Sequence, residues 1–272
     1  MRRMHAQMKT LSSRQNALVR TFRELRDSAE SNDARILVDG VHLVREAHRA
    51  ALEFEAIAVA VSHLTGHSEA GDLARSLESA GAPVYSVSDM VFRTMSPVRS
   101  PSGIVAIAKR VSWDASAISL TGAAFTLVAA DIQDPGNLGG LIRAAEAGGV
   151  TGVLVTGASA NPFSWKALRG SMGSTLRMPV AGGETLDAMV SRARASGTRT
   201  VAAVPRDGRA PEDVEWRGSV ALILGGEGSG LPAGVLTACD DLVTIPMAPP
   251  VESLNVAVAG AILIYAARRQ RS

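Results

Sequence analysis

The chain is poor in cysteine, lysine and aromatic side chains. Its 272 residues include one cysteine, Cys239, and 25 of the 28 basic residues are arginine. A single cysteine cannot form an internal disulfide or a cysteine-rich zinc site, so we expect no metal and a reducing, cytoplasmic environment. Aromatic residues make up 4% of the chain and hydrophobic residues 46%, which indicates compact cores of alanine, valine and leucine.

Long hydrophobic runs are missing as well. The longest strongly apolar run, 256–267, has 12 residues, whereas a membrane-spanning helix needs about 20. The basic N-terminal segment is followed by no apolar stretch of the kind found in secretory signals. We therefore expect neither a membrane segment nor a secretory signal.

The net charge of +2 conceals an uneven distribution of basic residues. Residues 1–26 carry six arginines and Lys9 against Glu24 alone, and the C-terminal end adds Arg268, Arg269 and Arg271. Arginine binds phosphate in a bidentate manner and stacks on bases, so a nucleic-acid partner is one explanation. Solvated basic tails or the base composition of the genome explain the same arginines, and composition leaves these explanations open.

The first third of the chain predicts a small α/β domain over residues 1–108. Its apolar periodicity alternates short helices and short strands. The expected helices are 13–28, 41–51, 69–79 and a turn at 88–95, and the expected strands are 35–38, 56–61, 83–86 and 103–108. The polar segment 109–123 is the expected linker to a second domain.

Residues 124–272 predict a second α/β domain. Five of its segments are continuously apolar, namely 125–130, 152–156, 198–204, 219–224 and 242–245. Such runs are typical of parallel strands that are covered on both faces. Ligands of these sheets bind at the carboxyl ends of the strands, so the residues that follow each strand are the candidates for a site.

The first candidate segment is D-I-Q-D-P-G-N-L-G-G-L-I-R-A-A-E-A-G-G-V, residues 131–150. It predicts a turn at 134–136, followed by a helix with Asn137 as its N-cap. Arg143 lies off the apolar stripe of that helix. It therefore faces either the crevice at the strand ends or solvent, where it would pair with Glu146.

The second candidate segment is L-G-G-E-G-S-G-L-P, residues 224–232. Its glycines permit a ligand to approach the backbone closely. The spacing from Gly225 to Gly230 imitates the dinucleotide fingerprint G-x-G-x-x-G, which keeps a dinucleotide-dependent oxidoreductase as an alternative. Glu227, in the middle of the loop, is either solvated or holds a ligand.

The third candidate segment, 245–268, joins the last strand to an apolar helix. Its three prolines cannot lie inside a helix, so the sequence predicts a rigid loop and a helix that starts at Ser253. Ser253 is either the N-cap or a ligand contact, and Asn255 lies in the same first turn. Apolar residues recur at helical spacing and fill most positions between, which predicts a helix buried nearly all round, with the stripe Leu254, Val258, Ala261, Ile262 and Tyr265.

Together, these three segments resemble the SpoU/TrmH family of RNA ribose 2′-O-methyltransferases, within the SPOUT class. The resemblance rests on D-x-x-D-P-x-N-x-G-x-x-x-R at 131–143, L-G-G-E-G-x-G at 224–230 and I-P-M-x(5)-S-L-N-V-A at 245–257. It implies a mostly parallel α/β domain with a deep C-terminal trefoil knot, in which the third segment passes through the loop of the second. The first third resembles the family's RNA substrate-binding domain, which is similar to a ribosomal protein, through I-L-V-D-G-V-H-L-V-R-E-A at 36–47.

The resemblance also implies the cofactor, the substrate and the site. S-adenosylmethionine is the implied cofactor, and the acceptor is a ribose 2′-hydroxyl, in ribosomal RNA of the 23S type ahead of transfer RNA. A non-catalytic RNA-binding assembly factor is a further alternative. The implied catalytic residues are Asn137, Arg143, Glu227, Ser253 and Asn255, and the implied cofactor-binding residues are Gly225, Gly226, Ile245, Pro246, Met247 and Leu254.

The working unit that the resemblance implies is a homodimer formed through the catalytic domain, with the helix from Leu254 to Arg268 at the interface. An interface explains why this helix is apolar on more sides than one sheet face needs. Arg143 of one protomer would then lie beside the cofactor of the other. We expect a charged residue at Ile264 to give monomers. A helix buried wholly within one chain is the alternative.

Overall fold

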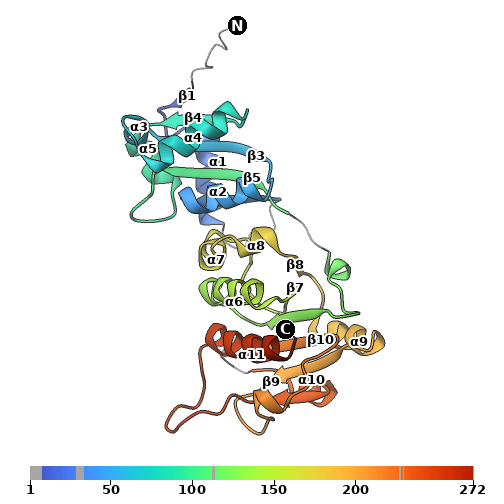
Figure 1. The fold of residues 1–272 in the computed structure, drawn as a ribbon. Helices are drawn as coiled ribbons and strands as arrows, with labels where there is room; N and C mark the ends of the chain where they lie inside the picture. Colours follow the sequence, from blue (N-terminus) through green and yellow to red (C-terminus); the bar gives the residue numbers. More distant parts are fainter. Residues whose placement is uncertain (1–7, 29–33, 112–113, 227, 229, 272) are drawn as a thin grey trace. The chain divides into compact units, whose positions relative to one another are not determined.

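The computed structural model describes residues 8–28, 34–111, 114–226, 228 and 230–271 (Figure 1). The chain forms two compact units. The first comprises residues 1–111 with 163–165, and the second comprises residues 112–162 with 166–272.

The first unit contains a mixed five-stranded sheet with the strand order β1-β4-β3-β5-β2. Its strands are β1 (Lys9–Leu11), β2 (Arg35–Asp39), β3 (Phe54–Ala60), β4 (Val84–Val87) and β5 (Ile104–Lys109). Its helices are α1 (Ala17–Asp27), α2 (Val41–Arg49), α3 (Val61–Leu64), α4 (Glu69–Ser79) and α5 (Asp89–Met95). The buried residues of α1 pack with those of β3, β5 and α5 in one apolar cluster that includes Phe22, Phe92 and Ile107.

The second unit contains a six-stranded parallel sheet with the strand order β11-β9-β10-β6-β7-β8. Its strands are β6 (Phe125–Ala130), β7 (Gly152–Thr156), β8 (Val180–Gly182), β9 (Arg199–Ala203), β10 (Val220–Gly225) and β11 (Asp241–Val243). Its helices are α6 (Pro135–Gly148), α7 (Trp165–Ser171), α8 (Ser174–Arg177), α9 (Leu186–Ala195), α10 (Ala233–Ala238) and α11 (Val256–Arg271). The predicted parallel α/β sheet is confirmed, and the short edge strand β8 is an addition that the apolar runs did not indicate.

Helices cover both faces of this sheet, which explains why its strands are apolar without alternation. Ile223 on β10 packs with α9 and α10 in one buried cluster. The next residue along the strand, Leu224, faces the opposite layer, where it lies near Gly260 of α11. The connections after β6 and β10 leave in opposite directions along the sheet, so the carboxyl ends of these neighbouring strands form the crevice where ligands of such sheets bind.

Helix α11 packs closely against α6, and the two lie side by side in Figure 1. The contact is tight because small residues meet large ones. A Cβ atom added to Gly148 of α6 would lie 2.0 Å from Cγ2 of Ile264, and one added to Gly260 of α11 would lie 2.2 Å from Cδ1 of Leu141. Ile264 is fully buried by this packing, so the expectation that it lies at an interface is wrong.

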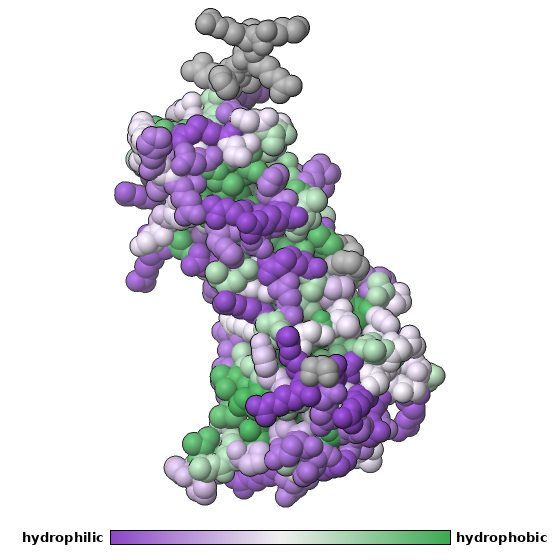
Figure 2. Space-filling view, viewed as in Figure 1, coloured by the Kyte–Doolittle hydropathy of each residue, from purple (hydrophilic) through white to green (hydrophobic). Residues whose placement is uncertain are grey.

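The prediction that α11 is buried nearly all round is also wrong. Val258, Ile262 and Tyr265 are 49%, 41% and 49% exposed, and Figure 2 shows hydrophobic surface over the first half of this helix. The predicted apolar stripe is therefore the outer face, and the residues that pack inward are Val256, Gly260, Leu263, Ile264 and Ala267. Throughout the described ranges, α11 included, no helix is long and apolar enough to cross a membrane.

An ion pair links α6 to α8. Arg177 donates hydrogen bonds to both carboxylate oxygens of Glu146, at 2.8 and 2.7 Å, and the side chains are 34% and 31% exposed. The hydrogen bonds from Arg177 lower the pKa of Glu146. A carboxylate with a lowered folded-state pKa contributes stability above its unfolded pKa and loses it as the pH falls through the folded value.

We therefore expect Glu146→Gln to lower the free energy of unfolding by about 0.5–1 kcal/mol at pH 7. The difference from wild type should shrink below about pH 4, the ordinary range of a glutamate carboxyl, and should vanish only below the lowered folded-state pKa, where the carboxyl is protonated in both states. Urea unfolding followed over this pH range measures it. The exposed Glu212 provides the control, because Glu212→Gln removes a charge without this pair. A Glu146→Gln difference that persists unchanged into acid would contradict the assignment of the effect to the ion pair.

Candidate active site

The first wall of the site is the N-terminus of α6, directly after β6. Asp134 caps this helix, because its Oδ1 accepts a hydrogen bond of 2.7 Å from the backbone N–H of Asn137. The expectation that Asn137 is the N-cap is therefore wrong, and Pro135 already occupies the first helical position, where its missing N–H costs nothing. Asn137 therefore lies in the first turn of α6, and its side chain makes another contact.

That contact comes from the N-terminus of α11. Asn255 caps α11, since its Oδ1 accepts from the backbone N–H groups of Ala257 and Val258 at 3.0 and 3.3 Å. Its Nδ2 donates a hydrogen bond of 2.9 Å to Oδ1 of Asn137. The helix thus begins at Val256 and not at Ser253, and Ser253 lies exposed in the loop before it. Two helix N-termini, each a site of partial positive charge, meet at this point.

The glycine loop after β10 forms the second wall. A Cβ atom added to Gly226 would lie 2.0 Å from the carbonyl oxygen of Asp131, so only glycine fits there. Asp131 itself has a left-handed backbone, with φ of 57°, and its Oδ1 accepts from the N–H of Ala158 at 2.7 Å. A strained residue at a strand end is typical of functional sites. Glu227 lies outside the described residues.

The course of this loop argues against the dinucleotide alternative. In that motif the last glycine opens a helix whose N-terminus binds the pyrophosphate. Here Pro232 follows the loop, and α10 begins only at Ala233. The helix is also only six residues long, from Ala233 to Ala238.

A cavity of about 560 Å³ lies between the glycine loop and the loop that precedes α11. Of the expected cofactor-binding residues, it is lined by Gly225, Gly226, Ile245, Met247 and Leu254, and Ser253 also lines it. Pro246 is exposed and is not among the lining residues. The other walls of the cavity are largely apolar, and they include Leu224, Leu231, Val243, Val256 and Leu263. Largely apolar walls with a few polar side chains, here Arg206, Glu252 and Ser253, suit a nucleoside-like ligand.

A smaller cavity of about 150 Å³ adjoins it through Gly226, Gly228 and Gly230, which line both. Its remaining lining residues are Asp131, Ile132, Gln133, Asp134 and Asn137. Neither Asp131 nor Gln133 was predicted to be a site residue, although both belong to the segment that follows β6. The available signal was their position directly after a buried strand.

Arg143 does not line either cavity. It lies on the exposed face of α6, six residues after Asn137, so the two side chains point about 120° apart around the helix. The alternative that Arg143 pairs with Glu146 is wrong, because Glu146 binds Arg177. The structure therefore brings Asn137, Asn255, Ser253 and the glycine loop together, and it leaves Arg143 apart from them within one chain.

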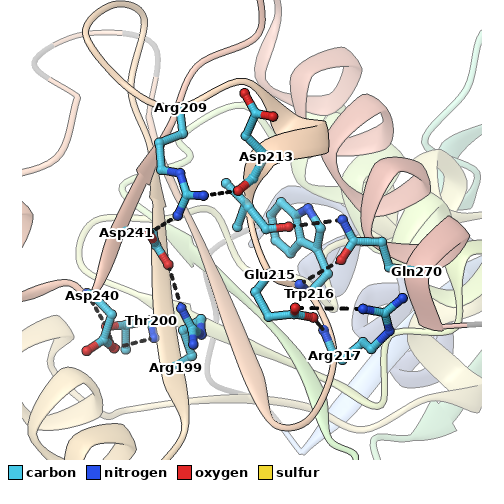
Figure 3. A network of polar contacts seen from close by, with 11 residues as sticks. Arg199, Thr200, Arg209, Asp213, Glu215, Trp216, Arg217, Asp240, Asp241 and Gln270 are labelled. Carbon is cyan, nitrogen blue, oxygen red and sulfur yellow. Dashed lines mark hydrogen bonds and ion pairs between the residues drawn. The ribbon is translucent and has the colours of Figure 1, made fainter.

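Strand β11, which leads into the cavity, is held in place by a carboxylate between two arginines. Asp241 accepts from Arg199 and from Arg209, each at 3.0 Å, and its side chain is 10% exposed (Figure 3). This contact fixes the start of β11 against β9, and it thereby positions the loop that carries Ile245 and Met247. Among the described residues, no group of three His, Cys, Asp or Glu side chains is arranged to hold a metal ion.

Comparison with known families assigns both parts of the chain. Residues 124–265 match the model of the SpoU rRNA Methylase family. Residues 16–106 match the model of an MRM3-like substrate binding domain.

Individual relatives align along nearly the whole chain. An uncharacterized tRNA/rRNA methyltransferase of Synechocystis is 32% identical over 96% of this chain and 94% of its own length. The 23S rRNA (guanosine(2553)-2′-O)-methyltransferase RlmP of Bacillus subtilis is 30% identical over 95% of this chain and 98% of its own. The crystal structure of an AdoMet-bound rRNA methyltransferase from Sinorhizobium meliloti has a TM-score of 0.83 and 26% identity, and covers 96% of this chain and 98% of that one.

Proposed function

The chain belongs to the SpoU rRNA Methylase family, and from this premise we propose that it is an S-adenosylmethionine-dependent methyltransferase that acts on a ribose 2′-hydroxyl of RNA. The observation that carries the proposal is the hydrogen bond between Asn255 and Asn137, which joins two helix N-termini beside the two cavities. Capping alone does not require this contact, because Asp134 rather than Asn137 caps α6.

The larger cavity fits the cofactor. Its volume of about 560 Å³ lies within the range of small-molecule sites. Leu224, Ile245 and Leu254 offer apolar surface to an adenine ring, while the glycine loop offers backbone groups to its polar edges. The loop segments 224–230 and 245–255 both line this cavity, which supports the proposal that they form the trefoil knot of the family.

When bound, S-adenosylmethionine supplies an electrophilic methyl group. The residues of this chain align the acceptor and assist the loss of its proton. Asn137 and Asn255 contact the ribose, and the two helix N-termini stabilise the negative charge that develops on its oxygen. Ser253 contacts substrate or cofactor from the rim, and Glu227 orients the donors of the site.

Arg143 completes the site from the partner protomer of a homodimer. A guanidinium is a poor general base, so the role of Arg143 is to bind the hydroxyl and the neighbouring phosphate. The exposed apolar stripe of Val258, Ile262 and Tyr265 on α11 supports a dimer contact. Because α11 packs on α6, which carries Arg143, such a contact would bring Arg143 close to the partner protomer. Within one chain Arg143 lines neither cavity.

Ribosomal RNA is the proposed substrate, ahead of transfer RNA, and the cytoplasm is the proposed location. The whole-length similarity to RlmP, named as a 23S rRNA methyltransferase, supports this choice. The first unit, which matches a substrate binding domain, provides RNA affinity in this proposal. A non-catalytic assembly factor is the second candidate, and methyl transfer to RNA distinguishes the two.

A substitution at Gly228 tests the cofactor site. A Cβ atom at Gly226 would meet the carbonyl oxygen of Asp131, and one at Gly225 would lie 2.9 Å from the carbonyl carbon of Gly230, so changes there would distort the loop. Gly228 lines both cavities and its added Cβ would meet nothing within 4 Å. We expect Gly228→Leu to fold normally and to lower S-adenosylmethionine affinity about 30-fold, by blocking roughly 2 kcal/mol of contacts.

Gly234→Leu is the matched control, because Gly234 also has open space around it but lies in α10, outside both cavities. Titration calorimetry with S-adenosylmethionine should show wild-type affinity for this variant. Equal cofactor affinity in wild type and Gly228→Leu would refute the assignment of the cavity. Absence of methyl transfer from wild type to 23S rRNA would favour the assembly factor.

A further inference from the structure

A second concave site lies in the catalytic unit, at the end of α11 and apart from the two cavities of the active site. It is a cavity of about 570 Å³, here called the arginine pocket, lined by Ala123, Gly148, Gly149, Arg217, Gly218, Arg268, Gln270 and Arg271. Three of these residues are cationic and none is acidic. The three glycines leave space that side chains would otherwise fill.

Two of the arginines are held in place by backbone carbonyls. Arg271 donates to the carbonyl oxygens of Trp216, Gly218 and Ala123, at 2.5, 2.7 and 2.5 Å, and its guanidinium stacks over Phe125. Arg268 donates to the carbonyl oxygen of Ala147. Carbonyl groups orient a guanidinium but leave its formal charge uncompensated. Burial lowers the pKa of Arg271.

The third arginine, Arg217, extends from the turn before β10. Its side chain forms an ion pair with Glu215 (Figure 3), in which Nη1 of Arg217 lies 3.7 Å from Oε2 of Glu215. The two side chains are 69% and 47% exposed, so water screens this pair and it contributes little. Among the described residues, these three guanidinium groups thus have one carboxylate partner, the exposed Glu215. Figure 2 shows hydrophilic surface around the C-terminal end of α11.

An anion is the ligand that this arrangement fits. Guanidinium groups bind phosphate oxygens by paired N–H donors, and those of Arg268 and Arg271 are already ordered before any ligand arrives. The cavity is larger than a single phosphate needs, so it has room for a phosphodiester with its adjoining sugar. We propose that the arginine pocket binds the phosphate backbone of the RNA substrate at a distance from the target nucleotide. This inference rests on the proposed function, because it takes RNA as the substrate.

Arg217 provides the cleanest test, since its side chain is 69% exposed and, within the described ranges, makes no backbone contact like those of Arg268 and Arg271. The full-length protein is titrated into a fluorescein-labelled single-stranded RNA of mixed sequence, about 20 nucleotides long, over a range of KCl concentrations. Each lost phosphate contact lowers the slope of log affinity against log salt by about 0.7. We expect Arg217→Gln to lower this slope by that amount and to weaken RNA binding about fivefold at low salt, and Arg217→Glu to weaken it further.

Arg194→Gln is the matched control. Arg194 is an exposed arginine of the same unit that also donates to a backbone carbonyl, that of Ala238, but it lies outside the arginine pocket. It should leave the RNA affinity within twofold of wild type. Arg268→Gln is an independent second variant and should reproduce the reduced salt slope. All variants should bind S-adenosylmethionine as wild type does.

The outcomes separate the two proposals. If Arg217→Glu and Arg268→Gln bind RNA with the affinity and the salt slope of wild type, the proposal that the arginine pocket binds RNA is overturned, and the proposed function is not affected. Failure of the wild-type protein to methylate either 23S rRNA or transfer RNA would instead refute the proposed function. Calorimetry with inorganic phosphate completes the test. Suppose that wild type binds free phosphate, that Arg217→Gln abolishes this binding, and that the RNA affinity does not change. The pocket would then be a site for a small anion, and its role in RNA binding would be overturned.

Discussion

Replacing Arg143 by alanine is expected to lower methyl transfer to RNA roughly a hundredfold or more, because a positioned donor to the reacting hydroxyl and its phosphate is lost. S-adenosylmethionine affinity should not change, since Arg143 lines neither cavity of its own chain. Folding should be intact as well, because the side chain is exposed on α6. Tritium transfer from labelled cofactor to 23S rRNA measures the rate, and calorimetry measures the affinity.

Two further variants sharpen this result. Arg143→Lys keeps the charge but loses the paired donors, so it should recover only part of the activity. Arg194→Ala removes an exposed arginine elsewhere in the same unit and should retain full activity. Methyl transfer by Arg143→Ala at the wild-type rate would remove Arg143 from the site.

The sheet of the catalytic unit was predictable because its strands are buried on both faces. Runs such as 125–130 and 152–156 correspond to β6 and β7 residue for residue. Strand β8 escaped prediction because it is three residues long and lies at the sheet edge. The order of the strands could not be read from the runs, since parallel neighbours leave no mark of their partners in the sequence.

The helix starts show where local signals compete. Asp134 and Asn137 are both good N-caps, and so are Ser253 and Asn255, so the sequence alone could not choose between them. The tertiary structure decides, because the side chain of Asn137 is needed to accept from Asn255. In both cases the cap was misassigned by two or three positions at a residue of the proposed site.

Helix α11 was misread for a related reason. An apolar residue at every position predicts burial, but it does not tell which face a neighbour covers. The glycines of α6 and α11 decide which face of α11 packs inward. Gly148 leaves room for Ile264, and with Ile264 packed against α6, Ile262 faces outward. Glu227 and the partner of the exposed stripe remain predictions of the sequence and its family.

A glutamate at Ile262 is expected to give monomers, whereas the same change at Ile264 is expected to unfold the catalytic unit. Ile262 is 41% exposed beside Val258 and Tyr265, so a charge there stays hydrated in a monomer but is buried in an α11-mediated dimer. Ile264 is fully buried against α6. Sedimentation velocity and thermal unfolding distinguish the two variants. A wild-type protein that is fully active as a monomer at micromolar concentration would contradict the dimer.

Mixing two inactive variants tests whether Arg143 acts in the partner's site. Arg143→Ala keeps its cofactor cavity, and Gly228→Leu keeps Arg143. With S-adenosylmethionine held well below the weakened dissociation constant of Gly228→Leu, each variant alone should be nearly inactive. If Arg143 reaches the other protomer, a mixed dimer has one complete site, and half of the dimers in an equal, re-equilibrated mixture are mixed. The mixture should then recover about a quarter of the wild-type activity. Adding Ile262→Glu to both chains should abolish this recovery. No recovery from dimers shown to exchange subunits would mean that Arg143 serves its own chain, because a site completed in cis stays broken in both variants.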